Sequence, residues 1–517
     1  MTEFTRIHQM IAPHAAARPD ATAVIDTDGT RVDWAGYAAR IDEAADLLAT
    51  QGVGPGDRVL IVAENCLALA VLVMACSRLD AWAVPVNARM SAAELSRIRA
   101  HARPACIVFT THVSAEAAEH AEQAHAVPVT TGFGRLALAE GPGGATEGEA
   151  GLAEAGPEQV AVILYTTGTT GDPKGVMLTH GNLLFAAHAS RALRDLVPSD
   201  HVYGALPMTH VFGLASMLMA SALTGCTVEL AARFSAEALY AALKRGATVV
   251  PAVPQMHAVL MAYAAQHGHE TLGSDRLRYV SSGAAPLDPA WKRKAEAFYG
   301  LPLQNGYGMT ETTAGVTGTR NAIGDPDTSV GPPLPGVEVR VCDPETRAEL
   351  PMGETGMLHV RGPNVFKGYW QMPEKTREEL QEDGWFITGD LARIDADGYV
   401  TIVGRGKDLI ISGGYNIYPK EIELLLVDQP GVLESAVIGV PHPDFGEGVT
   451  AVVALEPGAK LTEAEVRGAL ADELAGFKQP KRVFFVPTLP RNAMGKIQKV
   501  DLRADYRDAY AGPERTA

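Results

Sequence analysis

Residues 165–175 combine threonines, glycines and a lysine in the sequence YTTGTTGDPKG, directly after an apolar run. Glycines let backbone N–H groups approach an anion closely, and the hydroxyls and the Lys174 ammonium add hydrogen-bond donors and positive charge. The spacing differs from the GxxxxGK[ST] pattern of a P-loop. We interpret the segment as a loop that binds a polyphosphate. The alternative, an ordinary surface loop, does not account for this composition.

Two further segments carry groups suited to the rest of a nucleotide. Residues 305–312 read NGYGMTET, in which Tyr307 stands between two glycines and can present a flat face to a purine. Glu311 in the same segment offers carboxylate oxygens, the ligands that Mg²⁺ prefers. The sequence WFITGD ends at Asp390, whose carboxylate follows a tight turn and can accept hydrogen bonds from a ribose diol.

Two lysines in the C-terminal part of the chain also stand beside glycines. Lys407 lies in the sequence GRGKD, which opens the last part of the chain, and Lys496 ends the sequence PRNAMGK. The second sequence places a lysine on a glycine turn.

The elements expected to position these segments alternate between short apolar runs and amphipathic stretches. Residues 34–51 have a helical pattern, and strand-like runs lie at 23–26, 58–63, 105–109, 160–165, 228–230, 248–250 and 277–281. Alternating β and α units predict a largely parallel sheet covered by helices. The longest apolar runs, 67–76 and 211–223, are too short to span a bilayer and are expected to be buried helices.

After about residue 325 the pattern changes to short strands between glycine and proline turns. Runs at 336–341, 356–360 and 399–403 predict a small antiparallel or barrel-like subdomain. From Arg405 onward, the order helix, strand, strand, helix is expected at 419–427, 433–440, 449–455 and 462–474. The predicted fold class is therefore α/β, with a large N-terminal domain over residues 1–404 and a small α+β C-terminal domain over residues 405–517.

Length, charge and cysteine content limit the function further. The 517 residues are too many for a single core, and the 47% hydrophobic fraction is typical of a globular protein. A net charge of -17 argues against nucleic acid as a partner, because neutralising its phosphates needs a basic patch. The N-terminus shows no secretory-signal pattern and the 5 cysteines form no CxxC pair, so we expect a cytoplasmic, not membrane-embedded protein with free thiols.

In these motifs and in their order along the chain, the sequence resembles the adenylate-forming superfamily of acyl-CoA synthetases, aryl-CoA ligases, luciferases and peptide-synthetase adenylation domains. The motifs extend over residues 166–496, and the strand and helix pattern before them also fits. The resemblance implies an N-terminal domain that binds ATP and an acid, and a mobile C-terminal domain. The implied reaction converts a small carboxylic acid, ATP and coenzyme A to acyl-CoA, AMP and pyrophosphate through an acyl-adenylate, with Mg²⁺ present.

The resemblance also assigns roles to individual residues. It implies catalytic roles for Lys496, Glu311, Thr310 and His210, and Mg²⁺ ligation by Glu311 and Thr166. Residues expected to bind ATP or coenzyme A are Thr166, Thr167, Gly168, Thr169, Thr170, Gly171, Lys174, Ser282, Gly283, Ala284, Ala285, Pro286, Asn305, Gly306, Tyr307, Gly308, Asp390, Arg405, Lys407, Gly413, Gly414, Phe445, Lys478 and Lys481. The acid pocket is expected to contain His210, Val211, Phe212, Gly213, Pro254, Gln255, Met256, Gly283 and Gly308.

In the family, the C-terminal domain rotates between the two half-reactions. Lys407 matches the hinge position, Lys496 matches the lysine that serves adenylation, and Gly414 lies where a side chain would narrow the pantetheine tunnel. Phe445 matches an aromatic residue that contacts coenzyme A. A basic cluster of Lys478, Lys481 and Arg482 suits the phosphates of coenzyme A, with a solvated helix end as the alternative.

The acid is predicted from its pocket, whose residues are mostly apolar and suit an alkyl chain or an aryl ring. Residues 362–370 and 444–450 look like those of malonyl-CoA synthetases, but such relatives carry an arginine where this chain has Gly306. Burying an unpaired second carboxylate is costly. We therefore predict a fatty or aromatic monocarboxylate. A malonate-like dicarboxylate is the alternative if an arginine such as Arg233 supplies the missing charge.

Other functions also stay open. The enzyme can instead load its acyl group onto a separate carrier protein, and His210 can be a core histidine. A luciferase-like oxygenase would need a specialised pocket that the sequence does not indicate. A non-catalytic nucleotide sensor is disfavoured, because the phosphate loop, Glu311, Asp390 and Lys496 are all retained.

Overall fold

The computed structural model describes residues 4–143, 156–167, 173–283, 287–413, 415–471, 473–491 and 497–511. Its contacts divide the chain into two compact units. The first contains residues 1–339, 360–387 and 398–400, and the second contains 340–359, 388–397 and 401–517. The second unit thus includes strands that lie before residue 404 in the sequence. The predicted boundary at 404 and 405 and the hinge at Lys407 stay predictions.

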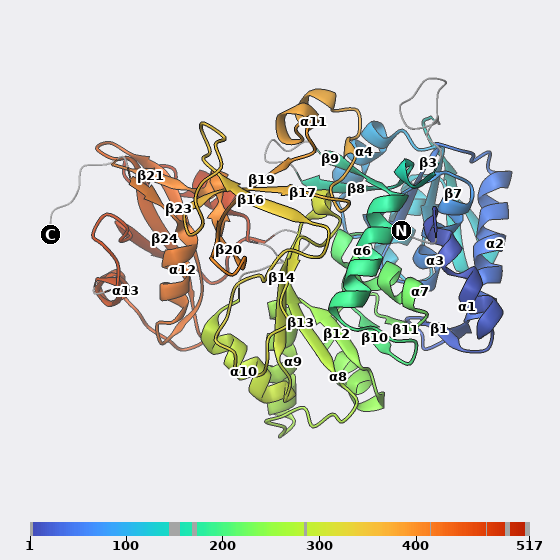
Figure 1. Ribbon diagram of the computed structural model, residues 1–517, viewed down its shortest axis with the longest axis horizontal. Coiled ribbons are helices and arrows are strands. Elements are labelled where there is room, and N and C mark those ends of the chain that lie inside the picture. Colours follow the sequence, from blue (N-terminus) through green and yellow to red (C-terminus); the bar gives the residue numbers. More distant parts are fainter. Residues whose placement is uncertain are drawn as a thin grey trace. The chain divides into compact units, whose positions relative to one another are not determined.

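Two eight-stranded sheets form the framework of the first unit (Figure 1). One sheet has the order β15 (Thr317–Gly318), β14 (Leu303–Tyr307), β13 (Tyr279–Gly283), β12 (Val249–Ala252), β10 (His201–Gly204), β11 (Thr227–Leu230), β1 (Thr22–Ile25), β2 (Arg31–Asp33). The other has the order β18 (Gly368–Tyr369), β9 (Pro173–Thr179), β8 (Val160–Thr167), β4 (Trp82–Asn87), β3 (Arg58–Ala63), β5 (Cys106–Phe109), β7 (Gly134–Glu140), β6 (Val127–Thr131). The central strands of both sheets are parallel, and antiparallel strands lie towards the edges.

Strand β3 shows why the sheets are buried on both faces. Val59 and Ile61 belong to the central core, whereas Leu60 and Val62 point to the opposite face and pack in a second core. This alternation follows from the two-residue repeat of a strand, and apolar residues on both faces are typical of parallel sheets covered by helices. The predicted alternation of strands and helices is confirmed.

Helices form three layers around the two sheets. The central core contains residues of both sheets together with α2 (Trp34–Thr50), α3 (Leu67–Arg78), α6 (His180–Leu193), the π-helix η3 (Phe212–Met219) and α7 (Ala220–Thr224). Helices α8 (Ala236–Arg245), α9 (Pro254–Gln266) and α10 (Pro289–Tyr299) cover the outer face of the first sheet, and α4 (Ala92–Ala102) and α5 (Ala115–Gln123) cover that of the second. Shorter elements are η1 (Ile7–Met10), α1 (Ala12–Ala17), η2 (Gly156–Glu158), η4 (Thr310–Thr312) and α11 (Pro373–Glu379).

The two long apolar runs of the sequence form buried helices, as predicted. Helix α3 is buried along nearly its whole length. The run 211–223 instead divides into η3 and α7, a change of winding that its mostly apolar sequence does not signal. In the described part of the chain, every helix lacks the length or the apolar character that crossing a bilayer requires.

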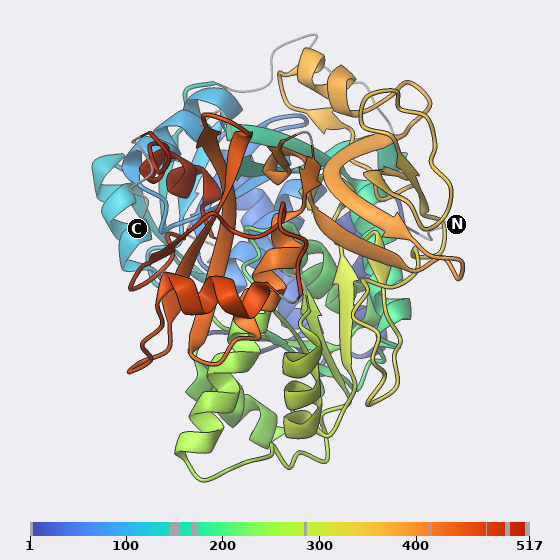
Figure 2. The same cartoon turned by 90° about the vertical axis from the view of Figure 1, so that its left-hand side faces the viewer.

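The second unit contains an open sheet and a five-stranded sheet. The strands β16 (Glu338–Cys342), β17 (Thr355–Arg361), β19 (Phe386–Ile394) and β20 (Val400–Arg405) form an open row, so the described residues contain no closed barrel at this point. Figure 2 shows the other sheet, formed by β21 (Ile410–Ser412), β22 (Tyr415–Ile417), β23 (Val432–His442), β24 (Gly446–Leu455) and β25 (Arg482–Phe485). Helices α12 (Pro419–Val427) and α13 (Glu463–Leu470) pack on one face of it and α14 (Lys499–Asp505) on the other, and η5 (Gly406–Asp408) precedes it.

Some details differ from the sequence-based expectations. Helix α13 ends at Leu470 rather than residue 474, and the hairpin of β6 and β7 had not been predicted. All five cysteines are buried and free, as expected.

Candidate active site

The two ends of the predicted phosphate loop lie side by side on the antiparallel strands β8 and β9. Thr166 and Lys174 are direct cross-strand partners, and the next pair is Thr167 with Pro173. The predicted loop residues Gly168, Thr169, Thr170 and Gly171 lie outside the described residues. The hairpin therefore places a hydroxyl and an ammonium at the two ends of a glycine-rich connection.

Lys174 belongs to a group of charged side chains that also contains the predicted metal ligand. Its Nζ lies 3.6 Å from Glu379 Oε1 and 5.0 Å from the centre of the Tyr369 ring. The Tyr369 hydroxyl lies 2.6 Å from Glu379 Oε2 and 2.9 Å from Glu311 Oε1. Tyr369 and Glu379 had no predicted role, because their meeting with Lys174 depends on the pairing of β18 with β9, which no local spacing reveals.

These carboxylates suit a divalent cation. Burial raises the pKa of Glu311, and the negative charge of Glu379 acts in the same direction. The Tyr369 hydroxyl has one hydrogen and can donate to only one of the two carboxylates at a time. Mg²⁺ is commonly held by one or two carboxylates, waters and substrate phosphates, and the described residues contain no larger His, Cys, Asp and Glu cluster. The donor set therefore fits Mg²⁺ bound together with a nucleotide.

Glu311 is placed by a tight turn that depends on Gly308. A Cβ atom at Gly308 would lie 2.1 Å from the Ala314 carbonyl oxygen, so the turn closes only over a glycine. Thr313 and Ala314 adopt left-handed backbone conformations with φ of 48° and 73°. The Thr313 hydroxyl donates to the Asn364 carbonyl at 2.7 Å, which holds this strained turn. Thr310, at its start, is buried beside Glu311.

Unpaired polar atoms mark the ends of strands β13 and β14. Ser282 and Asn305 are neighbours in the parallel ladder and both are buried. Within the described residues, the Ser282 hydroxyl and Asn305 Oδ1 have no hydrogen-bond partner, whereas Asn305 Nδ2 donates to Ser329 O at 2.9 Å. Buried polar groups normally find partners, so these two atoms suit the polar edge of a ligand such as a purine base. The predicted neighbours Ala284, Ala285 and Pro286 lie outside the described residues.

The predicted acid-pocket residues come from three segments of the first unit. A Cβ at Gly283 would lie 3.1 Å from the Phe212 ring, so these two residues are in contact. Gly213 packs so tightly that a Cβ there would lie 2.2 Å from the Pro207 carbonyl oxygen. His210 is half-buried, and its Nδ1 accepts the Phe212 N–H at 3.3 Å. Val211 is buried, Pro254 and Met256 at the start of α9 are half-buried, and Gln255 is exposed.

Asn65, which had no predicted role, fixes the loop before His210. Its Nδ2 donates to the carbonyl oxygens of Gly204 and Leu206 at 3.1 and 2.8 Å, and its Oδ1 accepts the Met208 N–H at 2.7 Å. A single asparagine after a strand carries no distinctive sequence signal, so only the structure reveals this contact.

Position 306 and Arg233 bear on the charge of the acid. Strand β15 pairs with β14 so closely that a Cβ at Gly306 would lie 2.9 Å from the Thr317 carbonyl oxygen. Arg233 is engaged elsewhere: its Nε lies 2.8 Å from buried Glu64, and its Nη2 lies 2.5 Å from Glu116. The positive charge of Arg233 is thus neutralised by two carboxylates of the protein.

The second unit contains the remaining predicted residues. Arg405 Nε lies 3.5 Å from Asp390 Oδ1, and Lys407 lies in η5. Gly413 N–H donates to the Phe445 carbonyl at 2.8 Å, and Lys481 Nζ lies 5.5 Å from the centre of the Phe445 ring. The predicted basic cluster is divided, because Lys478 pairs with Glu421 at 2.7 Å and Arg482 lies 3.9 Å from Glu463. Gly414 and Lys496 lie outside the described residues.

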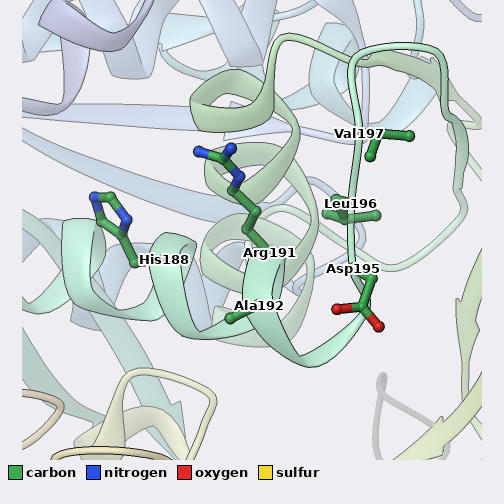
Figure 3. A pocket seen from close by; sticks show the side chains of 6 residues that line it. All are labelled: His188, Arg191, Ala192, Asp195, Leu196 and Val197. Atoms are coloured by element: carbon green, nitrogen blue, oxygen red, sulfur yellow. The ribbon is translucent and has the colours of Figure 1, made fainter.

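A pocket of about 410 Å³ at the end of α6 is separate from all of these residues (Figure 3). It is lined by His188, Arg191, Ala192, Asp195, Leu196 and Val197. None of the predicted site residues belongs to this pocket.

Comparisons with known proteins identify the family of the chain. The sequence profile of the AMP-binding enzymes matches residues 11–370, and that of the AMP-binding enzyme C-terminal domain matches residues 421–496. A feruloyl-CoA synthase from an Amycolatopsis species is 37% identical over 95% of this chain and 97% of its own length. A sulfoacetate–CoA ligase from Cupriavidus necator is 34% identical over 96% of this chain and 97% of its own.

Solved structures show the same relationship. The crystal structure of ATP-bound MatB from Rhodopseudomonas palustris matches with a TM-score of 0.82 and 39% identity, covering 97% of this chain and 99% of that one. An o-succinylbenzoate CoA synthetase from Bacillus subtilis, in complex with its acyl-adenylate, matches with a TM-score of 0.81 and 27% identity over 97% and 99% of the two chains. The chain therefore belongs to the AMP-binding enzymes of the adenylate-forming superfamily and is an AMP-forming acid–CoA ligase that uses ATP, Mg²⁺ and coenzyme A.

Proposed function

We propose that the acid activated by this ligase is a fatty or aromatic monocarboxylate. The observation that carries the proposal is that neither of the two positions considered for a second cation supplies one. Position 306 is a glycine packed against β15, and Arg233 is paired with Glu64 and Glu116. A second carboxylate on the substrate would be buried without a partner, at a cost of roughly 3 kcal/mol or more.

In the first half-reaction, a carboxylate oxygen attacks the α-phosphate of ATP and pyrophosphate leaves. Little proton transfer is needed, so positioning and charge neutralisation dominate the catalysis. We assign phosphate binding to Thr166, Lys174 and the loop between them. Mg²⁺, held by Glu311 with waters and phosphate oxygens, would offset the charge of the phosphates. Lys496 would stabilise the charge that develops at the α-phosphate, a contribution of about 3 kcal/mol by comparison with other preorganised donors.

In the second half-reaction, the thiol of coenzyme A attacks the acyl carbonyl and AMP leaves. Lys496 would obstruct the thiol if it stayed in place, so a rotation at Lys407 would exchange it for Gly413 and Gly414. Phe445 and Lys481 lie together in the second unit, which suits a role in contacting coenzyme A. Lys478 is a weaker candidate than predicted, because Glu421 already neutralises it.

A doubly charged acid is the second candidate substrate. The sulfoacetate–CoA ligase of Cupriavidus necator is named for a substrate with two acidic groups, and parts of the sequence resemble malonyl-CoA synthetases. A carrier-protein thiol as acyl acceptor is a less favoured alternative to coenzyme A. Because ATP and coenzyme A are cytoplasmic metabolites, we also propose that the reaction takes place in the cytoplasm, without nucleic acid as a partner.

An acid panel tests this proposal. The protein would be incubated with ATP, Mg²⁺ and coenzyme A, and with ferulate, fatty acids of several lengths, malonate or sulfoacetate, followed by measurement of AMP, pyrophosphate and acyl-CoA. We expect acyl-CoA and AMP in equal amounts from a monocarboxylate. Pyrophosphate release without a thioester would contradict coenzyme A as acceptor, and faster turnover of malonate or sulfoacetate would contradict the acid class.

A further inference from the structure

Helix α11 places a carboxylate where the predicted phosphate-binding lysine needs a counter-ion. Strand β18 pairs with β9 through Tyr369 and Val176, and α11 follows β18 directly and lies beside β9 in Figure 1. Glu379, the last residue of α11, thereby comes within 3.6 Å of Lys174 Nζ. The two side chains are partly exposed, at 25% and 20%, so both stay accessible to a ligand.

The geometry around Glu379 fixes the direction of its carboxylate. Oε2 lies 2.6 Å from the Tyr369 hydroxyl, and Oε1 lies between Lys174 at 3.6 Å and Lys375 at 3.0 Å. The Lys174 ammonium also lies over the Tyr369 ring, a cation–π contact that holds it on the same side. Lys174 therefore has a resident anionic partner when no nucleotide is bound.

A nucleotide phosphate and the Glu379 carboxylate compete for the same ammonium. Both are anions with oxygen acceptors, and a Lys174 that binds phosphate must weaken its contact with Glu379. Two anions close to one lysine also repel each other. The negative charge of Glu379 thus opposes nucleotide binding, whereas its contact with the lysine keeps the ammonium near the loop.

We propose that Glu379 is the resident counter-ion of Lys174, which ATP displaces, and that Glu379 thereby sets the affinity of this enzyme for ATP. The proposal rests on the proposed role of Lys174 in phosphate binding. It makes Glu379 a positioning residue that acts through Lys174 and leaves the choice of acid unaffected.

The test measures the dissociation constant of MgATP by isothermal titration calorimetry, without acid or coenzyme A. Partly exposed ion pairs of this kind contribute up to about 1 kcal/mol, so Glu379→Gln should tighten binding about two- to fivefold. Lys174→Gln should weaken binding about tenfold or more, because it removes a charged hydrogen-bond donor. In the Lys174→Gln background, Glu379→Gln should tighten binding less than it does in the unmodified enzyme, because only the repulsion between the two anions is then relieved.

Glu378→Gln is the matched control. Glu378 is the neighbouring acid on α11, is 65% exposed and pairs with Lys375 rather than with Lys174. Glu378→Gln should leave the affinity for MgATP unchanged. If Glu378→Gln tightened MgATP binding as much as Glu379→Gln, the effect of Glu379 would come from the overall charge of the protein, and the proposal would be overturned. Glu379→Asp is a second variant in case the first fails to fold. It withdraws the carboxylate by about 1.5 Å and should give a smaller gain of the same sign.

The outcomes separate this proposal from the one on which it rests. Unchanged or weaker MgATP binding by Glu379→Gln, together with a loss in Lys174→Gln, would overturn the counter-ion role alone. The same gain from Glu379→Gln in the presence and absence of Lys174 would also overturn it. Unchanged binding by Lys174→Gln would remove the phosphate-binding role of the lysine and the counter-ion role with it.

Discussion

Replacing Asn65 with alanine should loosen the loop that carries His210. The Asn65 side chain is buried and makes three hydrogen bonds to the backbone of residues 204–208. Truncation would remove the hydrogen-bond partners of the Leu206 carbonyl and the Met208 N–H, each at a cost of about 1–3 kcal/mol, whereas the Gly204 carbonyl also accepts the Ala231 N–H at 3.1 Å. Allowing for local relaxation, we expect the free energy of unfolding of the first unit to fall by roughly 3–5 kcal/mol.

Asn65→Ala should weaken binding of the acid more than binding of the nucleotide. The loop held by Asn65 leads to the candidate acid pocket, whereas Lys174 and Glu311 lie on other segments. We therefore expect the KM for the acid to rise by at least about tenfold while the KM for ATP stays within about threefold, since tenfold corresponds to 1.4 kcal/mol. Steady-state kinetics and urea unfolding measure the two effects.

Asn65→Asp is a useful companion to the alanine variant. It keeps the acceptor for Met208 but turns a carboxylate oxygen toward two carbonyl oxygens, so it should be at least as destabilising as alanine. Asn87→Ala is the matched control, because Asn87 is also buried but its Oδ1 accepts from the N–H and Nε of Arg89, two residues further along the chain, rather than from a distant loop. If Asn65→Ala lowered the free energy of unfolding by less than about 1 kcal/mol, or raised the KM values for the acid and for ATP equally, the reasoning would be refuted.

Two further changes test other parts of the site, and a third tests a buried histidine of helix α9. Gly308→Ala would place a Cβ 2.1 Å from the Ala314 carbonyl oxygen, and overpacking of this kind costs about 1–3 kcal/mol. The rate of pyrophosphate exchange should therefore fall at least about tenfold. Gly468→Ala is the control and should leave this rate unchanged, because the space around Gly468 is open. Lys496→Ala should slow acyl-adenylate formation about a hundredfold or more. The rate of thioester formation from a supplied acyl-adenylate should stay within a few-fold of that of the unmodified enzyme. Equal losses in both steps would contradict the assignment of Lys496 to adenylation. Burial lowers the pKa of His257 from 6.5 to about 4, so the folded state binds fewer protons than the unfolded state between these values. Its contribution of about 3 kcal/mol is therefore complete above pH 6.5 and is lost as the pH falls toward 4. His257→Gln should make the unfolding free energy less dependent on pH over this range, and an unchanged dependence would contradict the shift.

The elements that could be predicted from sequence are those with a clear local pattern. Strand β3 and helix α12 have the predicted bounds, because apolar runs end at a polar or glycine-rich neighbour and Pro419 begins its helix. For residues 211–223, the sequence predicted only that they form a buried helix. The two polar residues of this run, Ser216 and Ser221, do not mark the junction at Met219 and Ala220, where the π-helix gives way to α7.

The candidate site was predictable where its chemistry lies within one short segment. Thr166 and Lys174 belong to one hairpin, and Glu311 follows its own strand closely. Tyr369, Glu379 and Asn65 were missed, because their contacts join segments far apart in the sequence. For Arg233 the structure removed a candidate instead of adding one. The sequence allowed Arg233 to bind a substrate carboxylate, but the structure pairs it with Glu64 and Glu116.

The central claim, a coenzyme A ligase for a monocarboxylate, is tested most directly by comparing kcat/KM for matched acids in acyl-CoA formation. Burying an unpaired second carboxylate costs roughly 3 kcal/mol, which corresponds to a factor of about 150. We predict that the best aromatic or fatty monocarboxylate exceeds malonate in kcat/KM by at least about a hundredfold. Equal values, or a preference for malonate, would contradict the account.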